Sequence, residues 1–440
     1  MALPSQARLT GHYAQGVWGS DNVTIADING DGRPEFLHLQ SAGQLRSSIY
    51  RGWKGLGIDE RDAALHCLTA CTEDGTVLWQ DGAPWAHEEP FVGHGGSFVL
   101  AEDIDADGRV EVVVIRPADI AVLDGATGHM KASLPLPADN FSILNSAQLG
   151  EPAKGRQLIV KVNDAAYAPW EYGNPTLFLN ADLTPYAPAL GVRGAGHNIV
   201  ARDIDGDGRD ELFIGYSLYD HDLRELWRLD LGPGFDYVED HADAIVVSDV
   251  NGDGKLEVQY SGSEDFFVAD LSGHILWKTH AGHSQASAEG PWGPKGEKRI
   301  IMSEKNRGIW GLDAAGTVLW NRTDINGYAL SPVRWSRAKD RESWCLFLHT
   351  LRPFEETPFL SDPSWTKGLW PCLIDGDGTL HEVLPWNDAY SWPSRRIRSR
   401  RSYDAGVQFL PRAMDIDGDG LDEIIVVDRR NVWFFHSGEK

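Results

Sequence analysis

The sequence predicts an all-β fold, a single β-propeller of four-stranded blades. Three observations predict it. An acidic loop of the pattern Asp-x-Asp/Asn-x-Asp-Gly-x-x-Glu occurs five times, each time between apolar, β-branched runs of strand length. A second phrase, two apolar strands around a tight glycine-containing turn, recurs between these loops and often ends in Leu-Trp. No segment has a sustained helical period. Self-similarity at roughly fifty residues is typical of propellers or solenoids.

The acidic loops have the residue types of a calcium site. Carboxylates at positions 1, 3, 5 and 9 around a glycine turn offer hard oxygens on one arc, which suits calcium. The spacing differs from an EF-hand, which needs its glutamate at position 12 between two helices. The alternative is a turn whose Asp and Asn side chains bond only their own backbone. The predicted metal ligands are Asp27, Asn29, Asp31, Glu35, Asp103, Asp105, Asp107, Glu111, Asp203, Asp205, Asp207, Glu211, Asp249, Asn251, Asp253, Glu257, Asp415, Asp417, Asp419 and Glu423.

Each repeat reads as strand, acidic loop, strand, strand, turn, strand, which is one propeller blade. Three blades keep the strands but have lost the acidic loop. The repeat count gives eight blades, with seven possible if the third is irregular. The expected blades span residues 22–82, 97–137, 141–190, 197–232, 243–282, 284–324, 330–386 and 405 onward.

The last blade contains three strands before the chain stops. The N-terminal segment Ala-Arg-Leu-Thr-Gly can supply the fourth strand, so that the first and last segments of the chain pair. We therefore expect one propeller domain over residues 1–440.

Composition and charge exclude some functions. The formal net charge of −25 argues against nucleic acid as a partner. No run of 18 apolar residues predicts a transmembrane helix. The first residues lack the apolar core of a signal peptide, and four cysteines without a disulfide or metal-ligand pattern favour a reducing compartment. These features predict a cytoplasmic protein, or a secreted or periplasmic one if a leader is missing. They leave the oligomeric state open.

Histidines mark the predicted site. In a propeller, the loops that lead into the innermost strands meet at one face, opposite the acidic loops. Five of these entry loops contain a histidine just before the strand: His12, His94, His197, His241 and His283. A single loop histidine is usually a solvated or structural residue. Five at equivalent repeat positions indicate a shared pocket.

Arginines and aromatic residues are also predicted to lie on this face. The segment 391–404 contains Arg395, Arg396 and Arg398. These residues can bind an anionic ligand because arginine forms bidentate hydrogen bonds with carboxylates. Exposed tryptophan and tyrosine beside such arginines suit an acidic sugar. The predicted aromatic binding residues are Trp292, Tyr328 and Tyr403. The alternative is that the arginines form a solvated loop and that the rings serve packing.

The acidic loops, together with the Gly-His-Asn entry at 196–198 and the Asp-His-Ala-Asp entry at 240–243, resemble calcium-containing β-propeller polysaccharide lyases. These are the rhamnogalacturonan lyases, the ulvan lyases and the enzymes that release rhamnose from rhamnosyl-glucuronate. The acidic loop alone also resembles the FG-GAP repeats of integrin α-subunits. The resemblance is strongest over residues 94–283.

The resemblance implies β-elimination on an acidic polysaccharide or oligosaccharide that contains uronic acid and rhamnose. In those families histidine and tyrosine move the protons, and arginine or histidine neutralises the uronate carboxylate. Carried over, this points to His94 and His197 first, then His241 and His283, with Tyr172 and Arg193 as partners.

Two alternatives remain open at this point. One is a rhamnosidase-type glycoside hydrolase, for which Asp243 and Glu239 are candidate carboxylates. The other is a non-catalytic binding propeller of the integrin type.

Overall fold

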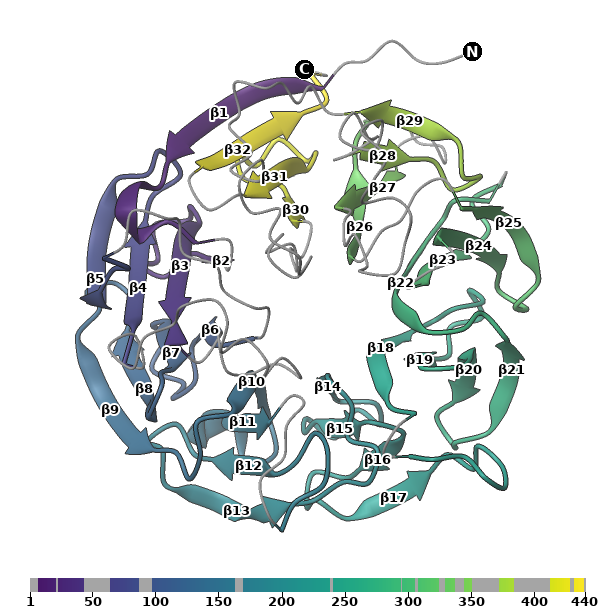
Figure 1. Cartoon of the computed structure of the whole chain (residues 1–440), viewed down its shortest axis with the longest axis horizontal. Helices are drawn as coiled ribbons and strands as arrows, with labels where there is room; N and C mark the ends of the chain where they lie inside the picture. The colour runs from purple at the N-terminus through teal and green to yellow at the C-terminus, as the bar shows by residue number, and fades with distance from the viewer. Residues whose placement is uncertain are drawn as a thin grey trace. The chain divides into compact units, whose positions relative to one another are not determined.

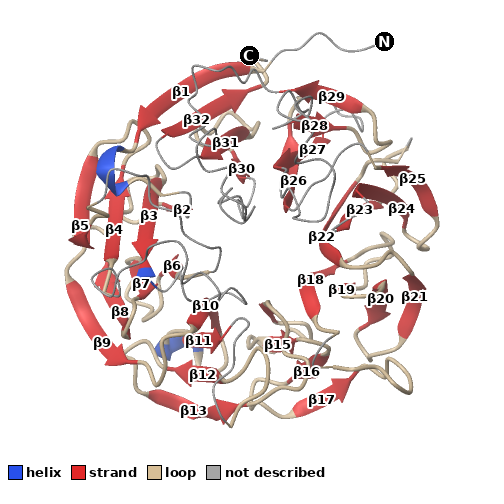
Figure 2. Ribbon diagram, viewed as in Figure 1, coloured by secondary structure: helices blue, strands red, loops and turns tan. Residues whose placement is uncertain are grey.

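The computed structural model describes residues 7–20, 23–42, 64–86, 97–162, 169–237, 240–293, 295–304, 308–323, 329–336, 344–349, 372–383, 412–427 and 431–438. Strands dominate these residues (Figure 2), and the 3-10 helices η1 (Gly16–Trp18) and η4 (Pro152–Lys154) are short. Within the described ranges, no helix combines the length and apolar character needed to span a bilayer.

The chain divides into two compact units. Unit 1 comprises Met1–Tyr13, Val246–Leu271 and Ile275–Lys440, and unit 2 comprises Ala14–Ile245 and Ser272–His274. The expectation of one domain over the whole chain stays a prediction.

The described residues of unit 2 form four sheets of four consecutive antiparallel strands (Figure 1). Their strands are β2 (Val23–Ala26), β3 (Glu35–Ser41), β4 (His66–Cys71), β5 (Val77–Ala83); β6 (Val99–Glu102), β7 (Glu111–Ile115), β8 (Asp119–Asp124), β9 (Met130–Pro135); β10 (Phe141–Ala147), β11 (Gln157–Val162), β12 (Thr176–Leu179), β13 (Pro185–Leu190); and β14 (Ile199–Arg202), β15 (Glu211–Ile214), β16 (Ser217–Tyr219), β17 (Glu225–Arg228).

The described residues form four further sheets, which belong to unit 1 apart from the first four residues of β18 and Ala14 at the end of β1, which lie in unit 2. Their strands are β18 (Ala242–Ser248), β19 (Glu257–Gly262), β20 (Phe266–Asp270), β21 (Ile275–Thr279); β22 (Ser284–Gly290), β23 (Arg299–Glu304), β24 (Gly308–Asp313), β25 (Val318–Arg322); β26 (Ala329–Arg334), β27 (Trp344–His349), β28 (Cys372–Ile374), β29 (Leu380–Val383); and β30 (Arg412–Met414), β31 (Glu423–Val427), β32 (Asn431–His436), with β1 (Arg8–Ala14).

These sheets confirm the predicted all-β propeller fold, and the eight sheets seen among the described residues agree with the repeat count of eight. The predicted pairing of the chain's first and last segments is also confirmed. β1 forms the fourth strand beside β32, and the Thr10 hydroxyl donates to the Phe434 carbonyl. A strand from the N-terminus thus completes the last blade.

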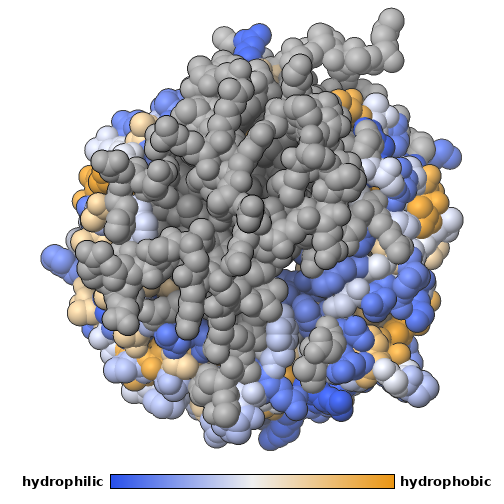
Figure 3. All heavy atoms as spheres, in the orientation of Figure 1, coloured by the Kyte–Doolittle hydropathy of each residue, from blue (hydrophilic) through white to orange (hydrophobic). Residues whose placement is uncertain are grey.

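The second and third strands of a blade are its most buried part. Every residue of β7 and β11 is buried, because both faces of these strands pack against neighbouring sheets. The outermost strands alternate between exposed and partly buried residues, as β9 does. Figure 3 shows hydrophobic residues in separate small groups among hydrophilic ones on the described part of the drawn face.

A tryptophan on the outermost strand connects successive blades. Trp79 of β5 donates its ring N–H to the Gly125 carbonyl of the next blade, 2.8 Å away. Its ring covers Gly128, where a Cβ would stand 2.6 Å from the indole and where φ is +71°. Trp277 and Trp320 make the same bond to Ala314 and Gly376. The tryptophan that ends the Leu-Trp phrase of one blade therefore packs against the glycine-containing turn of the next blade.

Candidate functional site

The candidate site lies in unit 2, where three connections supply its side chains. His197 lies in the connection from β13 to β14, two residues before β14, and His241 stands directly before β18. Tyr172 lies in the connection from β11 to β12. Because neighbouring strands of a blade are antiparallel, entry loops and second-to-third-strand connections open at the same end of the sheets.

The His197 loop is anchored on both sides of the histidine. Val192, Ala195 and Ile199 are buried in one apolar cluster of unit 2. The backbone N–H of His197 donates to the Ala242 carbonyl at 3.1 Å, which places the loop against the start of β18. Gly196 has φ +60°, and a Cβ there would stand 2.2 Å from the Ala242 oxygen. Only glycine allows this approach.

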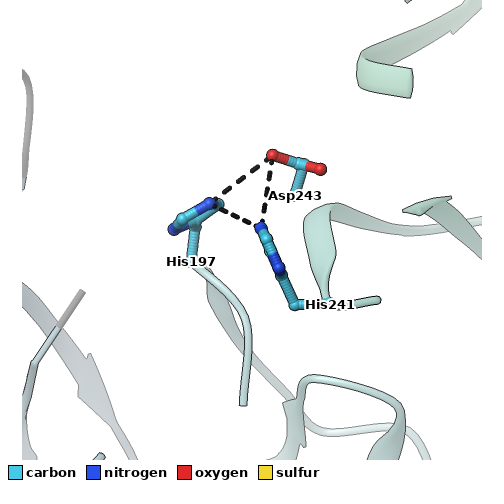
Figure 4. Close-up of side chains that lie close together, drawn as sticks. All are labelled: His197, His241 and Asp243. Carbon is cyan, nitrogen blue, oxygen red and sulfur yellow. Dashed lines mark hydrogen bonds and ion pairs between the residues drawn. The ribbon is translucent and has the colours of Figure 1, made fainter. Parts of the chain in front are cut away.

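His197, His241 and Asp243 point toward one another (Figure 4). The two Nε2 atoms are 3.0 Å apart and hydrogen-bonded. Asp243 Oδ1 lies 3.5 Å from His197 Nε2 and 3.9 Å from His241 Nε2. The side chains are 23%, 12% and 6% exposed in that order, so the cluster is open to solvent at His197 and closed at Asp243.

This contact constrains the protonation of the pair. One Nε2 must donate and the other must accept, so one proton lies between the two rings. A buried carboxylate lies beside the pair. The cluster can therefore hold and share a proton.

Tyr172 packs beside this pair. Its ring centroid lies 4.9 Å from that of His241 and 6.1 Å from that of His197. Asn174 fixes the turn, since its side-chain amide donates to the Tyr172 and Val192 carbonyls at 3.0 and 2.8 Å. The structure thus brings together three of the sequence-predicted residues, His197, His241 and Tyr172.

Arg193 belongs to the same loop as His197. Its side chain is exposed, and its Cζ stands 5.6 Å from the centroid of the Tyr237 ring. A cation held over an aromatic face while exposed to solvent can still bind an anionic ligand. The predicted role of Arg193 as a carboxylate partner stays a prediction.

Other predicted residues lie elsewhere. His283 stands directly before β22 in unit 1 and is not a member of the His197 cluster. His94, Glu239, Arg395, Arg396, Arg398, Tyr328 and Tyr403 lie outside the described residues.

Trp292 is a correction to the expected binding surface. It is 1% exposed and belongs to an apolar cluster with Ile301 and Ile309. Its ring fills space that two glycines leave, since a Cβ at Gly290 would stand 2.6 Å from it. A Cβ at Gly376 would stand 1.9 Å from the Trp292 Cβ. Trp292 is a packing residue, not a substrate-binding ring.

The acidic loops share one internal hydrogen-bond pattern. In the loop at 203–211, Asp203 accepts the backbone N–H groups of Gly206 and Gly208 at 2.7 and 3.0 Å. Glu211 accepts that of Ile204 at 3.0 Å. Burial, followed by the neighbouring aspartates, raises the pKa of Glu211, and burial likewise raises the pKa of Glu35, Glu257 and Glu423. Each loop is a bonded turn, and a cation would offset the cost of its buried carboxylate.

Three acidic loops hold carboxylate oxygens close enough to share a cation. These groups are Asp103 with Asp105 and Asp107, Asp203 with Asp205 and Glu211, and Asp415 with Asp417 and Glu423. His197, His241 and Asp243 form a fourth such group, with ligand atoms within 4.8 Å of one another. Nitrogen and oxygen donors together suit a transition metal or zinc better than calcium.

The loop at 103–111 has a cation of its own. Lys131 Nζ on β9 lies 2.8 Å from Asp105 and 2.7 Å from Glu111. Burial alone would lower the pKa of Lys131, but the hydrogen bonds and charges of the two carboxylates outweigh it and raise the pKa. The five loops are therefore not equivalent, which the shared motif did not indicate.

The fold and site together define a β-propeller protein with a partly buried imidazole pair and carboxylate at the entry to its inner strands. No protein-family model matches the chain. Two curated relatives confirm the resemblance predicted from sequence. The rhamnogalacturonan exolyase YesX of Bacillus subtilis (strain 168) is 32% identical over 362 residues, 68% of this chain and 53% of that protein. The rhamnogalacturonan endolyase YesW of the same organism is 34% identical over 330 residues, 60% of this chain and 48% of that protein.

The chain thus spans about half the length of the curated relatives that it matches. Among solved structures, the rhamnogalacturonan lyase PL11 of Bacillus licheniformis superposes with a TM-score of 0.58 at 15% identity. That match covers 96% of this chain and 72% of the other, and it supports the propeller fold.

Proposed function

We propose that this protein is a polysaccharide lyase that cleaves a rhamnogalacturonan-type glycan beside a uronate by β-elimination. The observation that carries the proposal is the Nε2–Nε2 hydrogen bond of His197 and His241 beside Asp243. The resemblance to an exolyase and an endolyase that act on rhamnogalacturonan supports the substrate class.

The residues fit the proton transfers of an elimination. The C5–H bond of the uronate breaks, its electrons form a double bond between C4 and C5, and the C4–O bond to the leaving sugar breaks. His197 is the more exposed member of the pair and is assigned as the base. In the tautomer in which the His197 Nε2–H donates to His241 Nε2, the His197 Nδ1 accepts the C5 proton, and Asp243 stabilises the resulting imidazolium.

Two further groups complete the reaction. The leaving oxygen needs a proton, and Tyr172, whose ring lies against His241, is assigned as its donor. The C5 proton becomes acidic enough only when the uronate carboxylate is neutralised, and Arg193 is assigned to bind that carboxylate.

Calcium in the acidic loops is part of the proposal as a structural ion. Of the three loops with clustered carboxylates, those at 203–211 and 415–423, whose clusters include the glutamate at position 9, are the strongest candidates. Ulvan is the second substrate to test, because it also contains rhamnose and a uronate.

The test is product analysis on rhamnogalacturonan, ulvan and gum arabic side chains, with the wild-type protein and with His197→Ala. The proposal expects products with an unsaturated uronate at the new end, and about 10²-fold or greater loss in the variant. The matched control is His280→Ala, because His280 is an exposed loop histidine that pairs with Asp265 instead. Release of sugars without the unsaturated end would favour the hydrolase, and ligand binding without turnover would favour the binding propeller.

A further inference from the structure

Lys161 is a fully buried lysine near the end of a largely apolar strand. It lies on β11, whose six residues are all buried, and its own exposure is 0%. An ammonium group is costly to remove from water unless hydrogen bonds compensate for the lost hydration. A leucine or methionine would fill this space without that cost, so the charge calls for an explanation.

The ammonium group bonds to the loop that carries His197. Nζ donates to the Gly196 carbonyl at 2.5 Å and to the Val162 carbonyl at 2.8 Å. Gly196 immediately precedes His197, so Lys161 fixes the peptide group from which the histidine extends.

The same ammonium group lies against the turn that carries Tyr172. A Cβ built on Gly173 would stand 3.3 Å from Lys161 Nζ and 3.1 Å from the Gly196 oxygen. Gly173 follows Tyr172 directly and has φ +73°. The tyrosine turn and the histidine loop therefore meet at the lysine head group.

The histidine loop needs such a support. It contains Gly191, Gly194 and Gly196, and glycine loses more conformational freedom on ordering than any other residue. From one side the loop bonds to β18, through the His197 N–H to Ala242 and the Asn198 side chain to the Asp243 carbonyl. From the other side it bonds to Lys161. A compact ammonium with several donors suits converging carbonyls better than a planar guanidinium.

We propose that Lys161 is a positioning residue that holds His197 and Tyr172 in register with His241. It acts through the backbone and does not touch substrate. Its effect on turnover rests on the proposed function, whereas its effect on the His197–His241 hydrogen bond does not.

The test uses Lys161→Met and Lys161→Gln in the full-length chain. The first readout is NMR of the imidazole nitrogens in ¹⁵N-histidine-labelled protein without substrate, with the two rings assigned from His197→Ala and His241→Ala. The shared-proton signature of the pair is expected in the wild type and expected to be lost in Lys161→Met. Lys161→Gln keeps one donor group and is expected to retain part of the signature if Lys161→Met does not fold.

The second readout is steady-state kinetics on rhamnogalacturonan. A misplaced base lowers kcat much more than it changes KM, so Lys161→Met is expected to lose about 10-fold or more in kcat with KM nearly unchanged. The matched control is Lys298→Met, because Lys298 also donates to a backbone carbonyl, that of Asp249, but does so at an acidic loop. It is expected to preserve both the NMR signature and kcat.

Three results overturn the proposal. One is an unchanged imidazole signature in Lys161→Met. Another is a loss of the imidazole signature and of kcat in Lys298→Met that equals the loss in Lys161→Met. The third, if Lys161→Met does not fold, is an unchanged signature in Lys161→Gln. A wild-type protein without lyase activity would contradict the proposed function alone, because the NMR comparison would still decide the role of Lys161.

Discussion

At the scale of single residues, the site depends on an imidazole pair that shares one proton. Neither His197 nor His241 can be assigned a protonation state independently of the other, because their Nε2 atoms are hydrogen-bonded at 3.0 Å. In the proposed reaction, Asp243, the least exposed member of the cluster, stabilises the positive charge on the ring that gains the substrate proton. The proposed proton transfer therefore needs both histidines.

This coupling predicts non-additive mutational effects. His197→Ala and His241→Ala are each expected to lower kcat/KM by about 10²-fold or more, and the double variant is expected to be little worse than either. Steady-state kinetics of the three variants checks this. Losses that multiply in the double variant would show that the two histidines act independently.

The sequence located part of this site and misassigned another part. Repeat position selected His197 and His241, because the entry loops of successive blades are equivalent. The sequence indicates Asp243 only as a hydrolase carboxylate, since its contact with His197 joins strand β18 to a loop that is distant in sequence. The prediction that Trp292 binds substrate was wrong. Gly290 and Gly376 leave a space for its ring, and no local sequence pattern reveals that space. A charged residue is unusual within an apolar run, so the lysine in the run at 157–162 was the sequence signal that could have singled out Lys161.

At the scale of elements, the acidic loops differ in how their charge is balanced. In the loop at 103–111 a lysine from the same blade bonds two of the carboxylates. In the loops at 203–211 and 415–423 the carboxylates at positions 1, 3 and 9 converge. The repeated motif predicted the turn correctly, but the balancing group comes from another strand and could not be inferred from the motif.

Removing the internal cation is expected to change calcium binding. In Lys131→Met, the loop at 103–111 is expected to bind calcium, so added calcium is expected to raise the Tm more than in wild type. Differential scanning fluorimetry with and without calcium measures this. Lys278→Met is the control, because Lys278 pairs with Asp265 away from the acidic loops. Equal calcium-induced increases in Tm in Lys131→Met and wild type would show that Lys131 does not block a calcium site.

A second element-scale contact links the first two blades of unit 2. The Asp81 carboxylate accepts a hydrogen bond from His66 at 2.8 Å and lies 3.5 Å from Arg116. The hydrogen bond from His66, followed by the charges of His66 and Arg116, outweighs burial and lowers the pKa of Asp81 below its ordinary value of 3.8. A carboxyl with a lowered pKa contributes stability above its unfolded pKa, and this stability is lost as the pH falls through the folded pKa.

Asp81→Asn is therefore expected to destabilise the protein at neutral pH and to make little difference at strongly acidic pH. Unfolding free energies of both proteins across the acid range check this. A difference that is constant across the pH range would contradict the linkage.

At the scale of the whole molecule, most of the architecture could be predicted because the same pattern of strands and turns recurs along the chain. The predicted blade from 141 to 190 agrees with β10–β13, although it lacks the acidic loop. The contacts between blades, such as Trp79 against Gly128, could not be predicted, since they depend on which turn faces which ring. The fold alone does not specify an enzyme, so the functional account depends on the His197 cluster and the similarity to the lyases.

The central claim is that this protein breaks a glycan by elimination beside a uronate. The most direct measurement counts new reducing ends and conjugated uronate ends, the latter by their ultraviolet absorbance, in one digest of rhamnogalacturonan. The account predicts one unsaturated end for every new reducing end, with both lost in His197→Ala. New reducing ends without the ultraviolet chromophore would contradict it.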